Sequence, residues 1–316
     1  MVSLKFAAVI CLVYFTVFVN AGKRPTCKTV LARLDEMESL CQGADSDNCD
    51  GTDVCTAIKT LEMKLETKLE NLFELVENIS MSLQPPPVTA SSCKELYDNG
   101  LRENKDYMLE IDSGKIPVYC HMTSDIGECG GGGWTMVMKI DGSKQTFHYD
   151  ADLWRNNNEF NLPGGETGFD SQETKLPTYW DTPFSKICLG MKVGQQTKFV
   201  VINKQASSLF SLIADGQHRA TSLSREKWKS LIGSEGSLQA HCNTQGFNAV
   251  GTNSGMAKAR IGIIGNQEND CNSCDSRIGF GTGGASDDSN TCGNEATHSP
   301  DNGDKHIKAM GFILVQ

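Results

Sequence analysis

The stretch that decides the fold is Gly130-Gly131-Gly132-Gly133-Trp134-Thr135-Met136-Val137-Met138-Lys139-Ile140. No helical pattern follows the four glycines, and an apolar segment headed by a tryptophan begins directly after them. The glycines are therefore predicted to be turn residues. Residues 134–140, in which polar and apolar side chains alternate moderately, are predicted to form a strand.

Short apolar runs broken by Gly, Asn and Asp continue after this stretch, which is typical of short strands joined by long loops. Further strands are predicted at residues 116–120, 198–203 and 311–315. The last two are near-continuous apolar runs, so we expect them to be buried central strands. A helix is predicted over residues 224–232, with Ser224 as its N-cap and Trp228 on its apolar face. The sequence thus predicts an α+β globular head.

Three consecutive prolines divide the chain. Gln84-Pro85-Pro86-Pro87 is followed by Val88-Thr89-Ala90-Ser91. Prolines lack an amide donor and favour an extended, semi-rigid segment. Residues 85–91 are therefore predicted to be a linker between a stalk at 22–84 and the head at 92–316.

The stalk carries one apolar stripe with the three-and-four spacing of a helix. Its members are Ile58, Leu61, Leu65, Leu69, Leu72, Val76, Ile79 and Leu83. Charged residues lie largely on the other faces. We expect an α-helical coiled coil that joins copies of the chain into a homo-oligomer, because the stripe has little surface of its own chain to cover. The alternative is a helix packed on its own domain.

Four cysteines and one glycosylation sequon also lie in the stalk. The cysteines are Cys27, Cys41, Cys49 and Cys55. Either Cys27 and Cys41 bridge neighbouring chains from a shorter helix, or the four form two local disulfides, and the sequence leaves both open. Asn78 in Asn78-Ile79-Ser80 is the predicted glycosylation site.

The start of the chain indicates secretion to the extracellular space. Lys5 precedes an apolar run at residues 6–19, and Val19-Asn20-Ala21 suits a signal peptidase, so residues 1–21 are predicted to be a signal peptide. No later segment approaches the roughly 20 apolar residues of a membrane span. Thirteen cysteines suit an oxidising compartment, and removal of Cys11 leaves an even number for complete pairing. The net charge of −10 argues against a nucleic-acid partner.

Three motifs, in this order, resemble the opening of a fibrinogen-related domain. They are Ser92-Cys93-Lys94-Glu95-Leu96, Val118-Tyr119-Cys120-His121-Met122 and Gly131-Gly132-Gly133-Trp134-Thr135. The resemblance implies a disulfide between Cys93 and Cys120 that ties the first loop to a strand. It also implies that the glycines let the chain approach this strand closely before a buried Trp134. His121 departs from the acidic residue common in that family.

The second half of the head is more similar to the intelectins, secreted lectins that share the fibrinogen-like opening. Ile278-Gly279-Phe280-Gly281 leads to Cys292-Gly293 at the family's spacing. The likeness implies a disulfide between Cys242 and Cys271. Ser276 and Ser286 stand where intelectins have a His and a Glu that bind a glycan-bearing calcium. Over its full length the chain most resembles secreted fibrinogen-like proteins of the coral skeletal organic matrix.

Acidic residues concentrate between Gly265 and His306, where eight Asp and Glu accompany two bases, Arg277 and Lys305. Hard cations take several oxygen ligands from loops of this kind, so calcium is the expected cofactor. The expected ligands are Asn272, Asp275, Asp287, Asp288 and Asn290. The alternative is a solvated acidic loop.

Cys271-Asn272-Ser273-Cys274 has the spacing of a redox or zinc motif. No second pair accompanies it and the compartment is oxidising. Both cysteines are therefore predicted to take part in separate structural disulfides.

The sequence carries no metalloprotease helix, nucleophile elbow or phosphate-binding glycine loop. The leading hypothesis is a secreted, non-enzymatic, oligomeric extracellular matrix or recognition protein. It would bind glycans or other matrix proteins, and it could belong to a biomineral organic matrix. The alternatives are a calcium-dependent intelectin-like lectin of innate recognition and a direct mineral-binding protein. The last is disfavoured because no acidic run exceeds two residues, as in Asp35-Glu36.

Overall fold

The computed structural model describes residues 64, 67–68, 70–77, 89–253 and 255–316, and the chain divides into two units, Met1–Pro86 and Pro87–Gln316. In the first unit every described residue is helical, in agreement with the predicted helix. Four large apolar side chains of this helix are exposed: Leu72, Phe73, Leu75 and Val76. The signal peptide, the stalk cysteines, Asn78 and linker residues 85–88 lie outside the described residues. The coiled coil stays a prediction.

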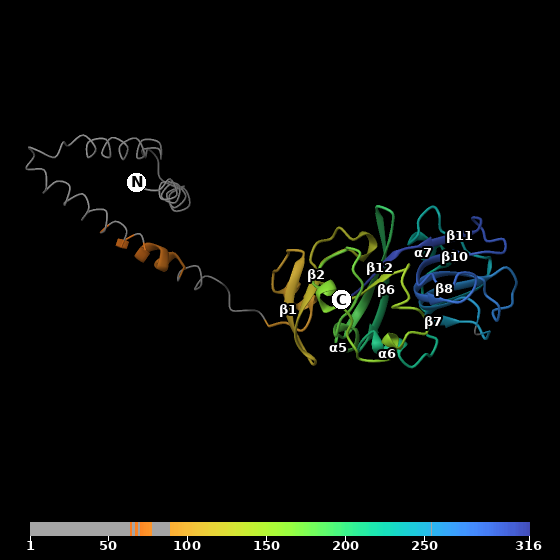
Figure 1. Ribbon diagram of the computed structural model, residues 1–316, viewed down its shortest axis with the longest axis horizontal. Coiled ribbons are helices and arrows are strands. Elements are labelled where there is room, and N and C mark those ends of the chain that lie inside the picture. Colours follow the sequence, from red (N-terminus) through yellow and green to blue (C-terminus); the bar gives the residue numbers. More distant parts are fainter. Residues whose placement is uncertain (1–63, 65–66, 69, 78–88, 254) are drawn as a thin grey trace, which may run out of the picture. The chain divides into compact units, whose positions relative to one another are not determined.

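The second unit contains a seven-stranded antiparallel sheet (Figure 1). Its strands are β1 (Lys105–Ile111), β2 (Gly114–His121), β3 (Trp134–Asp141), β4 (Thr174–Lys175), β5 (Phe184–Val193), β6 (Gln196–Ala206) and β12 (Met310–Val315). The order is β1-β2-β3-β12-β5-β6, and β4 pairs with β3. The last strand of the chain therefore lies inside the sheet, between β3 and β5.

A five-stranded antiparallel sheet follows in the order β11-β10-β9-β8-β7. Its strands are β7 (His241–Val250), β8 (Lys258–Asn266), β9 (Ser276–Gly283), β10 (Cys292–Ala296) and β11 (Lys305–Lys308). Each strand pairs with its neighbour in sequence. The loops between β8 and β9 and between β9 and β10 consequently lie at opposite ends of β9.

The helices of this unit are short. They are α4 (Cys93–Asp98), α5 (Thr178–Asp181), α6 (Phe210–Ile213) and α7 (Arg225–Ser230), with 3-10 turns η1 (Gly127–Cys129), η2 (Asp152–Trp154) and η3 (Leu162–Gly165). The Ser224 side chain accepts a hydrogen bond from the Lys227 amide and caps α7, as predicted. Trp228, on the predicted apolar face, is buried, and so are Leu231 and Ile232 directly after the helix. No helix among the described residues is both long and apolar enough to cross a membrane.

Two apolar clusters lie on the two faces of the large sheet. One contains residues of both sheets, with Ile313 and Val315 of β12 among them. The other contains Phe312 and Leu314 of the same strand, together with residues of β1, β2 and α4. Successive side chains of a strand point to opposite faces. Strand β12 is thus buried on both faces, as its near-continuous apolar run predicts.

The predicted strands at 116–120, 134–140, 198–203 and 311–315 are all present, but one prediction about position was wrong. Residues 198–203 belong to β6, which is the edge strand of the large sheet and not a central one. Val200 and Ile202 are nevertheless buried in the core between the sheets. An apolar run indicates that the side chains of a strand are buried. It cannot distinguish a central strand from an edge strand whose faces are covered.

Three disulfides link the described cysteines. Cys93 is joined to Cys120 and Cys242 to Cys271, the two pairs that the resemblance implies, and Cys129 is joined to Cys188. Cys274 and Cys292 are free and buried. The prediction of a disulfide at Cys274 was therefore wrong. The two free thiols lie in different apolar clusters, so burial accounts for them without pairing.

The glycine run makes the close approach that the sequence predicts. A Cβ atom on Gly132 would collide with the Met122 carbonyl and the Tyr97 ring, and Gly133 has φ +84°. The Gly133 amide donates to the His121 carbonyl at 2.9 Å. Trp134, directly after the turn, is fully buried.

Burial of β12 on both faces predicts that truncation on either face destabilises the head. We expect Ile313→Ala and Leu314→Ala each to lower the free energy of unfolding by about 2–5 kcal/mol. Met108→Ala is the control, because Met108 on β1 is 56% exposed, and it should change stability by no more than about 0.5 kcal/mol. Urea denaturation measures all three. A loss of stability in Ile313→Ala but not in Leu314→Ala would contradict a stabilising role of the cluster that contains Leu314.

Candidate functional site

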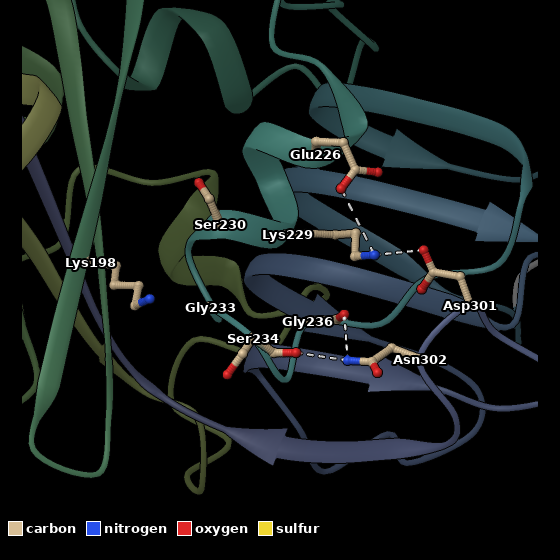
Figure 2. A pocket seen from close by; sticks show the side chains of 9 residues that line it. All are labelled: Lys198, Glu226, Lys229, Ser230, Gly233, Ser234, Gly236, Asp301 and Asn302. Atoms are coloured by element: carbon tan, nitrogen blue, oxygen red, sulfur yellow. Dashed lines mark hydrogen bonds and ion pairs between the residues drawn. The ribbon is translucent and has the colours of Figure 1, made fainter.

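A polar pocket of about 550 Å³ lies between β6, α7 and the loop that precedes β11 (Figure 2). Its lining residues are Lys198, Glu226, Lys229, Ser230, Gly233, Ser234, Gly236, Asp301 and Asn302. None of them is aromatic or aliphatic. The pocket therefore suits a ligand that exchanges hydrogen bonds and charge with the protein.

Strand β6 supplies Lys198 to one wall of the pocket. Val200 and Ile202, on the same face of the strand, fill the core between the sheets, and Lys198 lies where this face emerges from the core. A Cβ atom on Gly233 would lie 2.7 Å from the Lys198 Nζ, and Gly233 has φ +92°. The turn after α7 thus needs glycine at 233 and leaves room there for the ammonium group.

Charged groups on α7 and at Asp301 build the opposite wall. The Lys229 Nζ lies 2.6 Å from Asp301 Oδ2 and 3.9 Å from Glu226 Oε2. Arg225 Nη1 also donates to Asp301, at 2.8 Å. Partial burial favours the neutral acid, but hydrogen bonds from Lys229, the Leu238 amide and Arg225 outweigh it and lower the pKa of Asp301 to about 2. Asp301 is therefore a carboxylate at neutral pH.

Asn302 forms the floor of the pocket. Its Nδ2 donates to the carbonyls of Ser234, at 2.8 Å, and Gly236, at 3.3 Å. These bonds fix the amide plane and occupy both of its hydrogens, so the amide oxygen is available as an acceptor. The Ser230 hydroxyl donates to the Lys227 carbonyl at 2.6 Å and retains lone pairs. The pocket thus offers both donors and acceptors.

Three of the expected calcium ligands lie together in the loop between β9 and β10. The Asp288 Oδ1 is 2.9 Å from His148 Nε2 and also accepts from the Gly284 amide. The Asp287 Oδ1 accepts from the amide and hydroxyl of Ser289. Asn290 is buried, and its Oδ1 has no hydrogen-bond partner among the described residues.

A buried guanidinium organises this loop. The Arg277 side chain is fully buried. It donates to the main-chain carbonyls of Gly284, Ala285, Asp287 and Asn290. Burial lowers the pKa of Arg277 to about 10, against the opposing effect of nearby carboxylates such as Glu295. Arg277 is therefore a cation at neutral pH, and it already binds four carbonyl oxygens of the loop.

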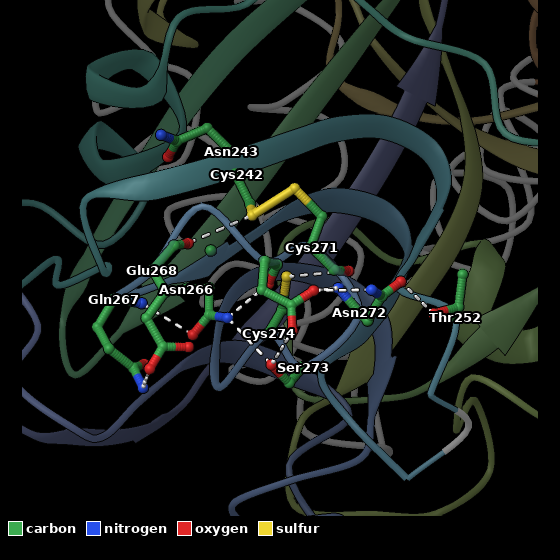
Figure 3. The surroundings of a disulfide bond; sticks show 12 residues. Cys242, Asn243, Thr252, Asn266, Gln267, Glu268, Cys271, Asn272, Ser273 and Cys274 are labelled. Atoms are coloured by element: carbon green, nitrogen blue, oxygen red, sulfur yellow. Dashed lines mark hydrogen bonds between the residues drawn. A yellow bond between two sulfur atoms is a disulfide. The ribbon is translucent and has the colours of Figure 1, made fainter.

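The other two expected ligands, Asn272 and Asp275, lie in the loop between β8 and β9, and Figure 3 shows Asn272 there. There the Asn272 side chain donates to Asp270 Oδ1 at 2.7 Å and accepts from the Thr252 hydroxyl. Asp275 directly precedes β9, whereas Asp287 follows it. The five expected ligands thus come from two loops. The described part of the chain holds no group of three or more His, Cys, Asp or Glu suited to a metal, and the calcium site stays a prediction.

The sequence holds little sign of the pocket, because its residues come from strand β6, from α7 and its following turn, and from the loop before β11. Arg277 did carry a signal. It is one of two bases among eight acids between Gly265 and His306. A base among so many acids indicates that the protein supplies its own cation there.

Comparisons with known proteins find distant similarity to solved structures. No family model and no curated protein sequence matches it. The lamprey fibrin D-dimer complexed with the peptide ligand Gly-His-Arg-Pro-amide is 18% identical, with a TM-score of 0.26 and 55% of each chain covered. The fibrinogen-like globe domain of human ANGPTL6 is 14% identical, with a TM-score of 0.33, and 73% of this chain and 97% of that one are covered. The chain thus spans about half of the length of the lamprey chain.

The four carbonyls around Arg277 predict a large effect of its removal. Arg277→Met keeps much of the side-chain volume but leaves these oxygens buried without a donor, so we expect the free energy of unfolding to fall by about 3–5 kcal/mol. Arg155→Met is the control, because Arg155 is exposed. This substitution should change the free energy of unfolding by no more than about 0.5 kcal/mol. Thermal and urea unfolding measure both variants. Equal stability of Arg277→Met and wild type would show that the guanidinium does not hold the loop.

Proposed function

We propose that the chain is a secreted, non-enzymatic recognition protein that binds extracellular glycans through the pocket between β6 and α7. The observation that carries the proposal is the pocket itself, in which ammonium, carboxylate, hydroxyl and amide groups converge. A sugar hydroxyl both donates and accepts hydrogen bonds, so this mixture matches saccharides. The signal-like start of the chain and the three disulfides support an extracellular setting.

The charges of the pocket favour binding over catalysis. A general acid or base works best when its pKa lies near the operating pH. The pKa of Asp301 is held at about 2, and its carboxylate is bound by Lys229, Arg225 and the Leu238 amide. The Asp301 carboxylate therefore orients the neighbouring donor groups and does not exchange protons at neutral pH.

A bulky substitution tests the pocket as a glycan site. Ser234 is exposed at its rim, so Ser234→Trp should fill the pocket without disturbing the core. We expect the secreted full-length protein to bind oligosaccharides on a glycan array, and Ser234→Trp to weaken binding at least about tenfold. Asn157→Trp, on an exposed loop outside the pocket, is the control and should bind like wild type.

Binding of no glycan, or glycan binding that Ser234→Trp leaves unchanged, would contradict the proposed site. If the wild type instead retained a matrix protein and Ser234→Trp did not, the pocket would be a site of protein recognition and not of glycan recognition.

The proposal includes a homo-oligomer formed through the helical stalk. Leu72 and Val76 belong to the apolar stripe and are 43% and 48% exposed. In a coiled coil, Asp at either position would place a charge in the apolar seam. We expect Leu72→Asp with Val76→Asp to dissociate the oligomer in sedimentation velocity at micromolar concentration. Asn71→Asp is the matched control, since it adds a charge to the same helix outside the stripe. A monomeric wild type would refute the coiled coil.

A further inference from the structure

We infer that the pocket selects saccharides that carry a carboxylate or sulfate, and that Lys198 holds this anionic group. The inference rests on the proposed function and specifies its ligand class. Its basis is that the other charged side chains of the pocket are paired and the ammonium group of Lys198 is not.

The carboxylates of the pocket are already engaged by other cations. Asp301 contacts Lys229 and Arg225, and Glu226 lies near both of them. The Lys198 side chain has no ion pair and no hydrogen bond within the part of the chain that the structure describes. Because Arg225 and Lys229 already bind the two carboxylates, Lys198 is the charged side chain of the pocket that is left without a partner.

The surroundings of Lys198 direct its ammonium group into the pocket. The side chain extends from β6 toward Gly233 and Ser234, as Figure 2 shows. An ammonium group has three donors, and none is used by the described residues. An anionic oxygen in the pocket would therefore gain a charge-assisted hydrogen bond without breaking an existing one.

The rest of the pocket suits the hydroxyl groups that accompany such an anion on a sugar ring. The Asn302 amide oxygen and the Ser230 hydroxyl can accept from sugar hydroxyls, and Ser234 is exposed beside them. Long polyanions are less suited, because the chain is strongly acidic overall and Glu226 lines the pocket. A single acidic residue of a glycan fits these constraints best.

Matched sugars test the inference. The probes are an oligosaccharide ending in glucuronic acid, its 6-sulfated glucose analogue and its neutral glucose analogue, titrated calorimetrically into the full-length protein. We expect at least one acidic sugar to bind about tenfold more tightly than the neutral one, as one charge-assisted hydrogen bond allows. The two acidic probes distinguish a carboxylate from a sulfate.

Variants of strand β6 test whether Lys198 causes the preference for acidic sugars. Lys198→Gln should reduce the ratio of acidic to neutral affinity to about one, and Lys198→Arg should retain most of it. Lys204→Gln is the control, since Lys204 belongs to the same strand and does not line the pocket. Melting temperatures confirm that all variants fold.

The outcomes separate the two proposals. Equal binding of acidic and neutral sugars, or a preference that survives Lys198→Gln, overturns the inference and leaves glycan recognition intact. Binding of none of the three sugars, together with no glycan on the array, overturns the proposed function as well.

Discussion

The pairing of β12 with both β3 and β5 is the constraint on which the head depends. Residues 310–315 pair antiparallel with Asp141–Thr135 on one side and Lys192–Ile187 on the other. Until the C-terminal strand is in place, the large sheet consists of two parts that are not hydrogen-bonded to each other, and neither apolar cluster is complete. Because these contacts join segments distant in sequence, we expect their closure entropy to make folding slow. The disulfide between Cys129 and Cys188 crosses the same gap, since it links the turn before β3 to β5.

Buried cations fix the long loops that the two sheets leave between their strands. Arg277 holds the loop between β9 and β10 through main-chain carbonyls. Lys139 binds Asp170 and the Thr167 carbonyl in the same way, and Lys175 donates to the Asn156 carbonyl at 2.6 Å. Burial lowers the pKa of Lys175 to about 8, which is still compatible with a charged side chain at neutral pH. In these loops, buried cations bind carbonyl oxygens that regular secondary structure would otherwise satisfy.

The sequence predicted strands and turns well and did not indicate the pocket between β6 and α7, for one physical reason. Strand β3, the glycine turn and the Ser224 cap follow from side-chain size, alternation and local hydrogen bonding, all of which act over a few residues. The edge position of β6 depends on which strands pair, which a run of apolar residues does not encode. The five expected calcium ligands were grouped because they are close in sequence, and the structure distributes them over the two loops on either side of β9. The pocket joins Lys198 to Asp301 across about a hundred residues, and only the folded chain brings them together.

The open, polar character of the pocket sets how such a protein can work. A few hydrogen bonds to one sugar residue, in a site lined by solvated groups, give weak binding because the ligand loses its own water contacts and its freedom of motion. Under the proposed function, recognition of a cell surface or matrix by this site would therefore require several heads that bind together. An oligomeric stalk would supply these heads, and each would bind at an effective concentration set by its neighbours. The predicted coiled coil and the proposed glycan site would then serve one function: the stripe that contains Leu72 would set the number of sites, and the pocket that contains Lys198 would set their selectivity.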